Sequence, residues 1–197
     1  MATPRKVKAI VGNVYYYKDG ITRFILKPEL KCKFKPGQFL HLALDAYDPS
    51  YNWPDSRVFS IASSNKKKEI EILISPKGKF THKMVDSLKV GDQVWIKLPY
   101  GDFNLNTSKD DTIVLIAGGT GISPFIGFLE DLKNVTDQEN ILLYYGVRSQ
   151  EHIIYDELLF ELSNNLKSFK FDLFIENKPA ALSHPYQNGI IDLDKII

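Results

Sequence analysis

Eight consecutive residues, at positions 117–124, have the composition of a phosphate-binding turn. The sequence there is Ala-Gly-Gly-Thr-Gly-Ile-Ser-Pro, with three glycines within four residues. Glycines permit a tight turn and let a ligand approach the backbone, because they lack a Cβ. An apolar run at 112–116 precedes the turn and an amphipathic run at 125–132 follows it, which predicts a strand, a turn and a helix. That arrangement directs unpaired backbone N–H groups toward an anion such as a phosphate.

The turn is not diagnostic by itself. It lacks the Gly-Lys-Ser/Thr of a P-loop, and Pro124 stands where a G-x-G-x-x-G motif has its last glycine. Ser123 suits the N-cap of the predicted helix, and Pro124 suits its first position because proline has no N–H. An ordinary glycine-rich connection in an α/β protein would have the same composition.

A second group of chemically useful side chains lies at residues 57–60. On a strand, Arg57 and Phe59 project to one face, and Val58 and Ser60 to the other. An arginine, an aromatic ring and a hydroxyl offer phosphate pairing, a stacking surface and a hydrogen-bond donor. Many edge strands carry a similar combination, so this segment indicates a cofactor site only together with other segments of the chain.

Composition argues against several other functions. The chain has 197 residues and a formal net charge of +1, which favours neither nucleic acid nor a membrane surface as the main partner. We expect a cytoplasmic protein, since neither a signal-peptide core nor a transmembrane-length apolar run is present. Cys32 is the single cysteine and is expected to be a packing residue. The four histidines lack metal-binding spacing, so no metal site is predicted.

The chain changes character near residue 105. Before that point, short β-rich segments alternate with turn signals, which predicts an antiparallel barrel. The six segments are residues 6–17, 22–26, 38–44, 57–62, 69–74 and 93–98. A short helix is expected at 82–88, and the triple lysine 66–68 is expected to be a solvated hairpin tip.

After a polar linker, nearly continuous apolar strands alternate with amphipathic helices. This pattern predicts a parallel sheet covered on both faces. The expected strands are residues 113–117, 141–145 and 171–175, and the expected helices are 124–133 and 155–164. Residues 190–197 could start a third helix.

Taken in order, these segments resemble the ferredoxin–NADP reductase-like superfamily, whose members place a flavin-binding barrel before a pyridine-nucleotide domain. The resemblance depends on an R-x-Y/F-S segment at 57–60 and a G-G-T-G-x-x-P segment at 118–124. Further similar segments extend it over nearly the whole chain, at residues 34–39, 78–81, 99–103, 145–148 and 155–158.

The resemblance implies two domains: an FAD-binding β-barrel at residues 1–105 and an NAD(P)-binding, Rossmann-like α/β domain at residues 112–197. It implies hydride transfer from NAD(P)H to FAD, followed by electron transfer to an acceptor. That acceptor stays open among free flavin, an iron–sulfur protein and an oxygenase component, as does the choice between NADH and NADPH. FAD is favoured over FMN because residues 78–81 resemble the family's second flavin-phosphate loop. No nucleic-acid or membrane partner is expected.

The resemblance also assigns roles to individual residues. Arg57 would pair with the flavin phosphate, Phe59 would stack on the isoalloxazine ring, and Ser60 would hydrogen-bond near flavin N5. Thr120 would lie where nicotinamide meets flavin, so Ser60 and Thr120 are the candidate catalytic residues. The remaining cofactor-binding candidates are Val58; Leu73, Ile74 and Ser75 through their backbone; Gly78, Lys79, Phe80 and Thr81 at the second phosphate; Gly119 and Gly121 at the NAD(P)H pyrophosphate; and Arg148 at the adenosine, where a solvated loop arginine is the alternative.

One feature of the superfamily has no counterpart in this sequence. Its members usually continue with a strand that carries Cys-Gly-Pro beside the nicotinamide, and no such triplet occurs here. We therefore expect a nucleotide domain that is reduced or truncated, with three strands. The alternative to a reductase is a non-catalytic flavin- or nucleotide-binding module, or a subunit completed by a partner chain.

Overall fold

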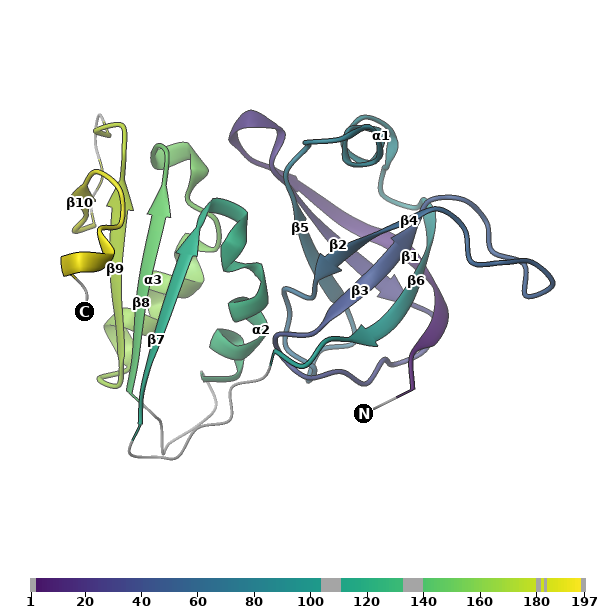
Figure 1. Ribbon diagram of the computed structural model, residues 1–197, viewed down its shortest axis with the longest axis horizontal. Helices are drawn as coiled ribbons and strands as arrows, with labels where there is room; N and C mark the ends of the chain where they lie inside the picture. Colours follow the sequence, from purple (N-terminus) through teal and green to yellow (C-terminus); the bar gives the residue numbers. More distant parts are fainter. Residues whose placement is uncertain (1–2, 104–110, 133–139, 180–181, 183, 196–197) are drawn as a thin grey trace. The chain divides into compact units, whose positions relative to one another are not determined.

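The computed structural model describes residues 3–103, 111–132, 140–179, 182 and 184–195. By packing, the chain forms two units, an all-β unit and an α/β unit (Figure 1). The first unit contains residues 1–105 together with residues 123–130, and the second contains residues 106–122 and 131–197. Most of one helix therefore packs with the first unit, although the residues on both sides of it belong to the second.

The first unit is a six-stranded antiparallel sheet that curls into a barrel. Its strands are β1 (Arg5–Tyr16), β2 (Thr22–Pro28), β3 (Phe39–Ala43), β4 (Ser56–Ser60), β5 (Ile70–Ile74) and β6 (Gln93–Tyr100). Their order in the sheet is β4-β3-β6-β1-β2-β5. All six predicted strands are confirmed, each to within two residues at either end. Alternating apolar side chains, such as Val7, Ala9 and Val11 of β1, fill the interior because successive strand residues face opposite sides.

Two local predictions for this unit are wrong. Helix α1 (Lys79–Ser87) begins three residues before the predicted start, with Gly78 as its N-cap. The Thr81 hydroxyl accepts hydrogen bonds from the backbone N–H groups of Lys77 and Gly78, so the cap reaches back from inside the helix. Lys67, expected at a solvated hairpin tip, forms ion pairs with Glu71 and Glu130.

The second unit is a parallel sheet with strand order β10-β9-β8-β7. These strands are β7 (Thr112–Gly118), β8 (Asn140–Val147), β9 (Phe169–Ile175) and β10 (Gln187–Asn188). Helix α3 (Asp156–Asn165) packs on β9, and helix α2 (Ser123–Leu132) follows the 3₁₀ turn Gly119–Ile122. The three predicted strands and both predicted helices are confirmed within the described residues.

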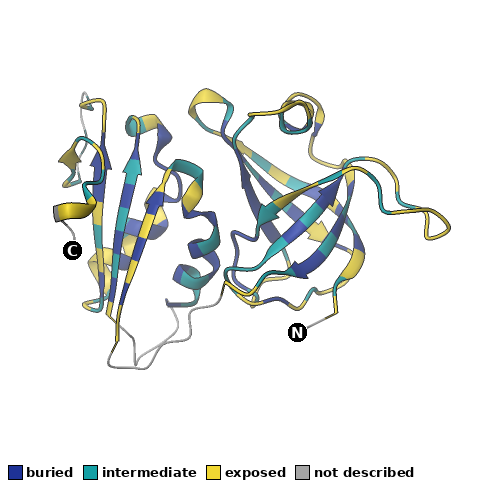
Figure 2. Cartoon of the chain, in the orientation of Figure 1, coloured by how far each residue is buried: buried dark blue, intermediate teal, exposed yellow. Residues whose placement is uncertain are grey.

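Three expectations for the second unit need correction. Strand β10 was not predicted, because two polar residues carry no hydrophobic pattern. The expected third helix is a single 3₁₀ turn, Leu193–Lys195, within the residues described. On β7, Val114 is 47% exposed and Ile116 is 42% exposed, so the described residues leave one face of the sheet uncovered there (Figure 2). No described helix has the length and apolar character needed to cross a membrane.

Candidate functional site

The barrel has an open seam between its two terminal strands, β4 and β5. The chain just past β4 meets β5 where the N–H of Ala62 donates to the carbonyl oxygen of Glu71 at 2.8 Å. Continuing that antiparallel alignment sets Ser60 opposite Leu73. In the described part of the chain, β4 and β5 are the ends of the sheet, with no ladder partner on their outer edges. The seam therefore presents backbone donors and acceptors to a ligand.

The β5 residues predicted to bind flavin can do so only through their backbone. Leu73 is 6% exposed and Ile74 is 2% exposed, and the Ile74 side chain belongs to the barrel core. Ser75, which follows the strand, is half-buried. Backbone contacts from these residues to a flavin stay a prediction.

Three side chains of β4 occupy different environments. Phe59 is half-buried and packs against the barrel core, whereas Val58 is 55% exposed. Ser60 is half-buried, and its hydroxyl has no hydrogen-bond partner among the described residues. A hydroxyl in this position can donate to a ligand at the seam. Stacking of Phe59 on a flavin ring remains a prediction, and Val58 is the exposed alternative beside it.

A cavity of about 290 Å³ lies where β4 begins, next to helix α1. Three cationic side chains and the ring of Phe80 line it, together with Leu44 and two carboxylates; the charged residues are Arg57, Lys79, Lys83, Asp45 and Asp55. Its formal charge is therefore positive, as a site for phosphate groups requires.

Arg57 is already engaged on two sides within this cavity. Its Nη1 lies 2.6 Å from the Asp55 carboxylate and also donates to the Ser56 carbonyl oxygen at 2.8 Å. Its guanidinium carbon lies 5.1 Å from the centre of the Phe80 ring, a cation–π contact. Because half of the Arg57 side chain is exposed, the guanidinium can still reach a phosphate. Phe80, which was predicted to bind cofactor, contacts the Arg57 guanidinium with its ring and packs against the core.

The N-terminus of helix α1 supplies further donors for an anion. The first hydrogen bond of the helix runs from the His82 N–H to the Gly78 carbonyl oxygen, so the N–H groups of residues 79–81 precede the helical ladder. Space is open where a Cβ of Gly78 would lie. The predicted second phosphate segment, residues 78–81, is thus a helix N-terminus, and Lys79 lies on the cavity wall.

Sequence reasoning missed Lys83, which lines the same cavity as Arg57. Lys83 lies one helical turn after Lys79, and its Nζ is 3.8 Å from the Asp45 carboxylate. The signal was present in the i, i+4 spacing of the two lysines, which puts them on one face of a helix. Because the helix was predicted to begin at residue 82, Lys79 fell outside it and the spacing was not recognised.

In the second unit, the glycine turn follows β7 directly. Gly119 has φ +50°, in the left-handed region that glycine tolerates best. Among the described residues, nothing lies within 4 Å of a Cβ placed on Gly118, Gly119 or Gly121, so the turn can be approached closely. Thr120 is half-buried in this turn.

Arg148 follows β8, the strand next to β7. Gly118 and Gly146 are register partners at the carboxyl ends of these two parallel strands. The turn at 119–122 and Arg148 therefore emerge at the same edge of the sheet, which is the edge where open α/β sheets bind nucleotides. Arg148 is exposed.

The predicted residues fall into two sets, one in each unit. The flavin set, residues 57–60, 73–75 and 78–81, lies in the first unit, and Gly119, Thr120, Gly121 and Arg148 lie in the second. Among the residues that the structure describes, no group of three or more His, Cys, Asp or Glu side chains is placed to hold a metal ion.

Comparison with known proteins gives matches over both units. A family model described as an FAD-binding domain matches residues 6–123, more than half of the chain. A model described as an oxidoreductase NAD-binding domain matches residues 115–196.

Two curated relatives and one solved structure illustrate the range of similar proteins. The flavodoxin/ferredoxin–NADP reductase of Buchnera aphidicola is 32% identical over 86% of this chain and 68% of its own length. The reductase component of propane 2-monooxygenase from Mycolicibacterium smegmatis is 31% identical over 72% of this chain. The crystal structure of an Amycolatopsis cytochrome P450 reductase superposes with a TM-score of 0.79, at 25% identity, over 95% of this chain and 56% of that chain. The chain matches 40% of the length of the Mycolicibacterium relative.

Proposed function

Because the chain belongs to the ferredoxin–NADP reductase-like family of FAD-binding proteins with an oxidoreductase NAD-binding domain, we propose that it is an NAD(P)H-dependent flavoprotein reductase. The observation that carries this proposal is the cationic cavity at Arg57, at the start of the strand whose last residue, Ser60, has a hydroxyl with no hydrogen-bond partner among the described residues. A phosphate-bearing, flat cofactor suits that combination, since one end needs cations and the other needs backbone donors.

The residues of both units fit FAD and a pyridine nucleotide. Arg57, Lys79, Lys83 and the N-terminus of α1 would hold the two flavin phosphates. The seam residues Ser60 and Leu73 would border the flavin ring. The turn at 119–122 would cradle the nucleotide pyrophosphate with its open backbone, and Arg148 would border the adenosine.

When bound, FAD would supply the redox chemistry, which moves a hydride equivalent from NAD(P)H and then two electrons to an acceptor. The chain's own residues would bind FAD and the nucleotide and orient them. Ser60 would donate a hydrogen bond near the reacting nitrogen, and Thr120 would border the nicotinamide. No general acid or base is required of the protein for hydride transfer.

We place the acceptor among proteins that take electrons from a flavin. This proposal is supported by the names of the relatives, a monooxygenase reductase component and a flavodoxin/ferredoxin–NADP reductase. Free flavin is the competing acceptor, and an assay with each kind separates them.

The proposed function is tested by loading the purified chain with FAD and following NADH and NADPH oxidation with an artificial electron acceptor. We expect turnover with at least one nucleotide and a slower rate for Ser60→Ala. Tight FAD binding without turnover would instead identify a non-catalytic flavin-binding module. Folded protein that binds no flavin would contradict the assignment altogether.

A further inference from the structure

One end of the barrel contains a second cavity, which the proposed cofactor sites do not use. Its volume is about 310 Å³. Its walls come from the start of β1, the end of β6 and the segment that follows β2, all of which belong to the first unit. Small-molecule sites have volumes of this order and often lie at the mouths of β-barrels. We call it the barrel-end cavity.

An arginine occupies an inward-facing position at this end of the barrel. Alternate residues of β1 face the core, and Val7, Ala9 and Val11 are buried there. Arg5 continues the same alternation, and its register partner on β6 is Leu98, which is 2% exposed. Because residues paired across two strands share a face, the Arg5 side chain leaves the sheet on its apolar side. The strand pattern therefore places a guanidinium where the barrel core ends.

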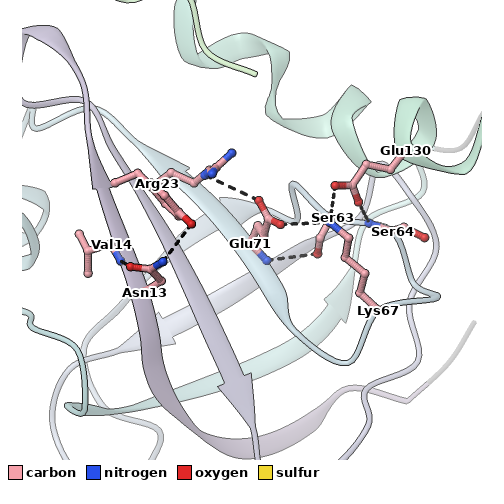
Figure 3. Close-up of polar contacts among 9 residues, drawn as sticks. Asn13, Val14, Arg23, Ser63, Ser64, Lys67, Glu71 and Glu130 are labelled. Atoms are coloured by element: carbon pink, nitrogen blue, oxygen red, sulfur yellow. Dashed lines mark hydrogen bonds and ion pairs between the residues drawn. The ribbon is translucent and has the colours of Figure 1, made fainter. Parts of the chain in front are cut away.

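Three cationic side chains line the barrel-end cavity, and no carboxylate is among its described lining residues. The three are Arg5, Lys31 and Lys33, whose formal charges add to +3. In the described part of the chain, none of them forms an ion pair with a carboxylate. Other cations of this unit are paired, as Arg23 and Lys67 are with Glu71 (Figure 3). A concave surface lined by charges of one sign attracts a ligand of the opposite sign.

The remaining lining of the cavity is mainly apolar. Val7, Leu98 and Pro99 are buried and belong to its wall. Leu30, which also lines the cavity, is 63% exposed. An inorganic anion would gain nothing from these side chains, whereas the apolar part of an organic anion would remove them from water. Charge and apolar surface together therefore favour a ligand that has both.

The thiol of Cys32 faces the same space. Cys32 is half-buried and lines the cavity between the two lysines in sequence. Burial raises the pKa of its thiol, and the positive charge of Arg5 opposes that rise, so the two groups are close enough to interact. An anion bound to Arg5 would offset that charge and would also cover the thiol. Both effects would slow the reaction of Cys32 with thiol reagents.

We propose that the barrel-end cavity binds a small organic carboxylate whose body is apolar. Arg5 pairs with the carboxylate, since a guanidinium matches the two oxygen atoms of that group. Lys31 and Lys33 add to the attraction, and the body of the ligand packs against Val7 and Leu98. All of these residues belong to the first unit, so the site goes beyond the proposed reductase function and does not depend on it.

The test uses the full chain without FAD or nucleotide, with benzoate as the probe. Cys32 is labelled with an uncharged maleimide at mildly alkaline pH, and the labelling rate is followed as benzoate is added. We expect a saturable decrease in rate for the folded protein and no decrease in denaturant. Two companion probes separate the contributions. Benzyl alcohol has the ring without the charge, and sulfate has the charge without the ring, so each should protect only at much higher concentrations.

Substitutions assign the protection to this cavity, and the half-protecting concentration of benzoate is compared because Arg5 also affects the thiol itself. Arg5→Gln should raise that concentration by about tenfold, since a charged hydrogen-bonding partner is lost. Lys33→Gln should raise it by about threefold, as expected for an exposed cation. Lys8→Gln is the matched control, because Lys8 lies on the same strand, outside the cavity, and pairs with Glu29 at 3.3 Å. Arg57→Gln, in the other cationic cavity, should likewise have no effect.

Three results would overturn the inference. The first is no saturable protection of the folded wild type. The second is an unchanged half-protecting concentration in both Arg5→Gln and Lys33→Gln; should Arg5→Gln not fold, Lys31→Gln takes its place. The third is protection by sulfate or by benzyl alcohol at the same concentration as benzoate, since charge or apolar surface alone would then suffice. Absence of flavin reduction would refute the proposed function and leave these expectations unchanged.

Discussion

The Arg57 guanidinium forms an ion pair with the Asp55 carboxylate at 2.6 Å, and both side chains line the cationic cavity. Both side chains are more than half exposed, so the ion pair by itself contributes little to the free energy of unfolding. Its larger effect would be on ligand binding, since a phosphate must compete with Asp55 for the same nitrogen atoms.

Replacement of Arg57 by alanine should weaken FAD binding by about 1.5–3 kcal/mol, or roughly 10- to 150-fold, because a charged phosphate loses its partner. Asp55→Asn should instead strengthen binding, since it removes the competing carboxylate. Titration by quenching of flavin fluorescence measures both. Lys8→Ala, a change to a half-buried cation outside the cavity, is the control and should have no effect.

Lys83 should distinguish FAD from FMN. If Arg57 and the α1 lysines share the two phosphates of FAD, Lys83→Ala should reduce FAD affinity more than FMN affinity, because FMN has a single phosphate. Parallel titrations with both flavins give the ratio. Equal losses for the two flavins would place Lys83 at the phosphate that they share.

The stacking role of Phe59 can be separated from its packing role. Phe59→Leu keeps apolar volume against the core but removes the aromatic face, so it should shift the absorbance of bound flavin with a modest loss of stability. Phe59→Tyr should preserve the spectrum. If instead Val58→Ala alone perturbs the spectrum, the exposed valine covers the ring.

His41 should make the stability of the barrel depend on pH. Burial and the nearby charge of Lys97 hold the pKa of His41 below its ordinary value of 6.5. The folded state therefore favours the neutral ring, and its stabilising contribution is complete above pH 6.5. That contribution is lost as the pH falls from 6.5 through the lowered pKa. Urea denaturation at several pH values should show this decline, and His41→Gln should reduce it.

Cys32 should react slowly with thiol reagents at neutral pH. Burial raises the pKa of its thiol, an effect that the charge of Arg5 only partly opposes, and its Sγ lies 3.4 Å from the Leu30 carbonyl oxygen. The thiolate is the reactive form, so labelling of the folded protein should lag behind labelling in denaturant. Equal rates in both conditions would contradict this.

The strands were predictable because their apolar residues alternate or form short continuous runs bounded by turn residues. The start of α1 was not, because its cap is the Thr81 hydroxyl reaching back to Gly78, a contact that leaves no conventional signal before the helix. Strand β10 depends on pairing with β9 rather than on its own composition.

The residues of the candidate site were predictable wherever a motif contained them, as at 57–60 and 119–121. Lys83 lies outside the motifs, and only the fold brings it to the cavity that Arg57 lines. Likewise, nothing in the triple lysine 66–68 indicates that its middle residue pairs with a carboxylate 63 positions later. Contacts between distant segments are decided by tertiary packing, which single-sequence patterns do not record.

The packing of residues 123–130 with the barrel has a consequence for dividing the chain. A fragment that ends at residue 105 would keep every strand of the barrel but would expose the backbone at Ser63 and leave Ser64 without the Glu130 carboxylate. The remaining fragment would start with a strand whose following helix had lost its binding surface. A fragment meant to keep the first unit whole therefore has to retain residues 123–130 as well as residues 1–105.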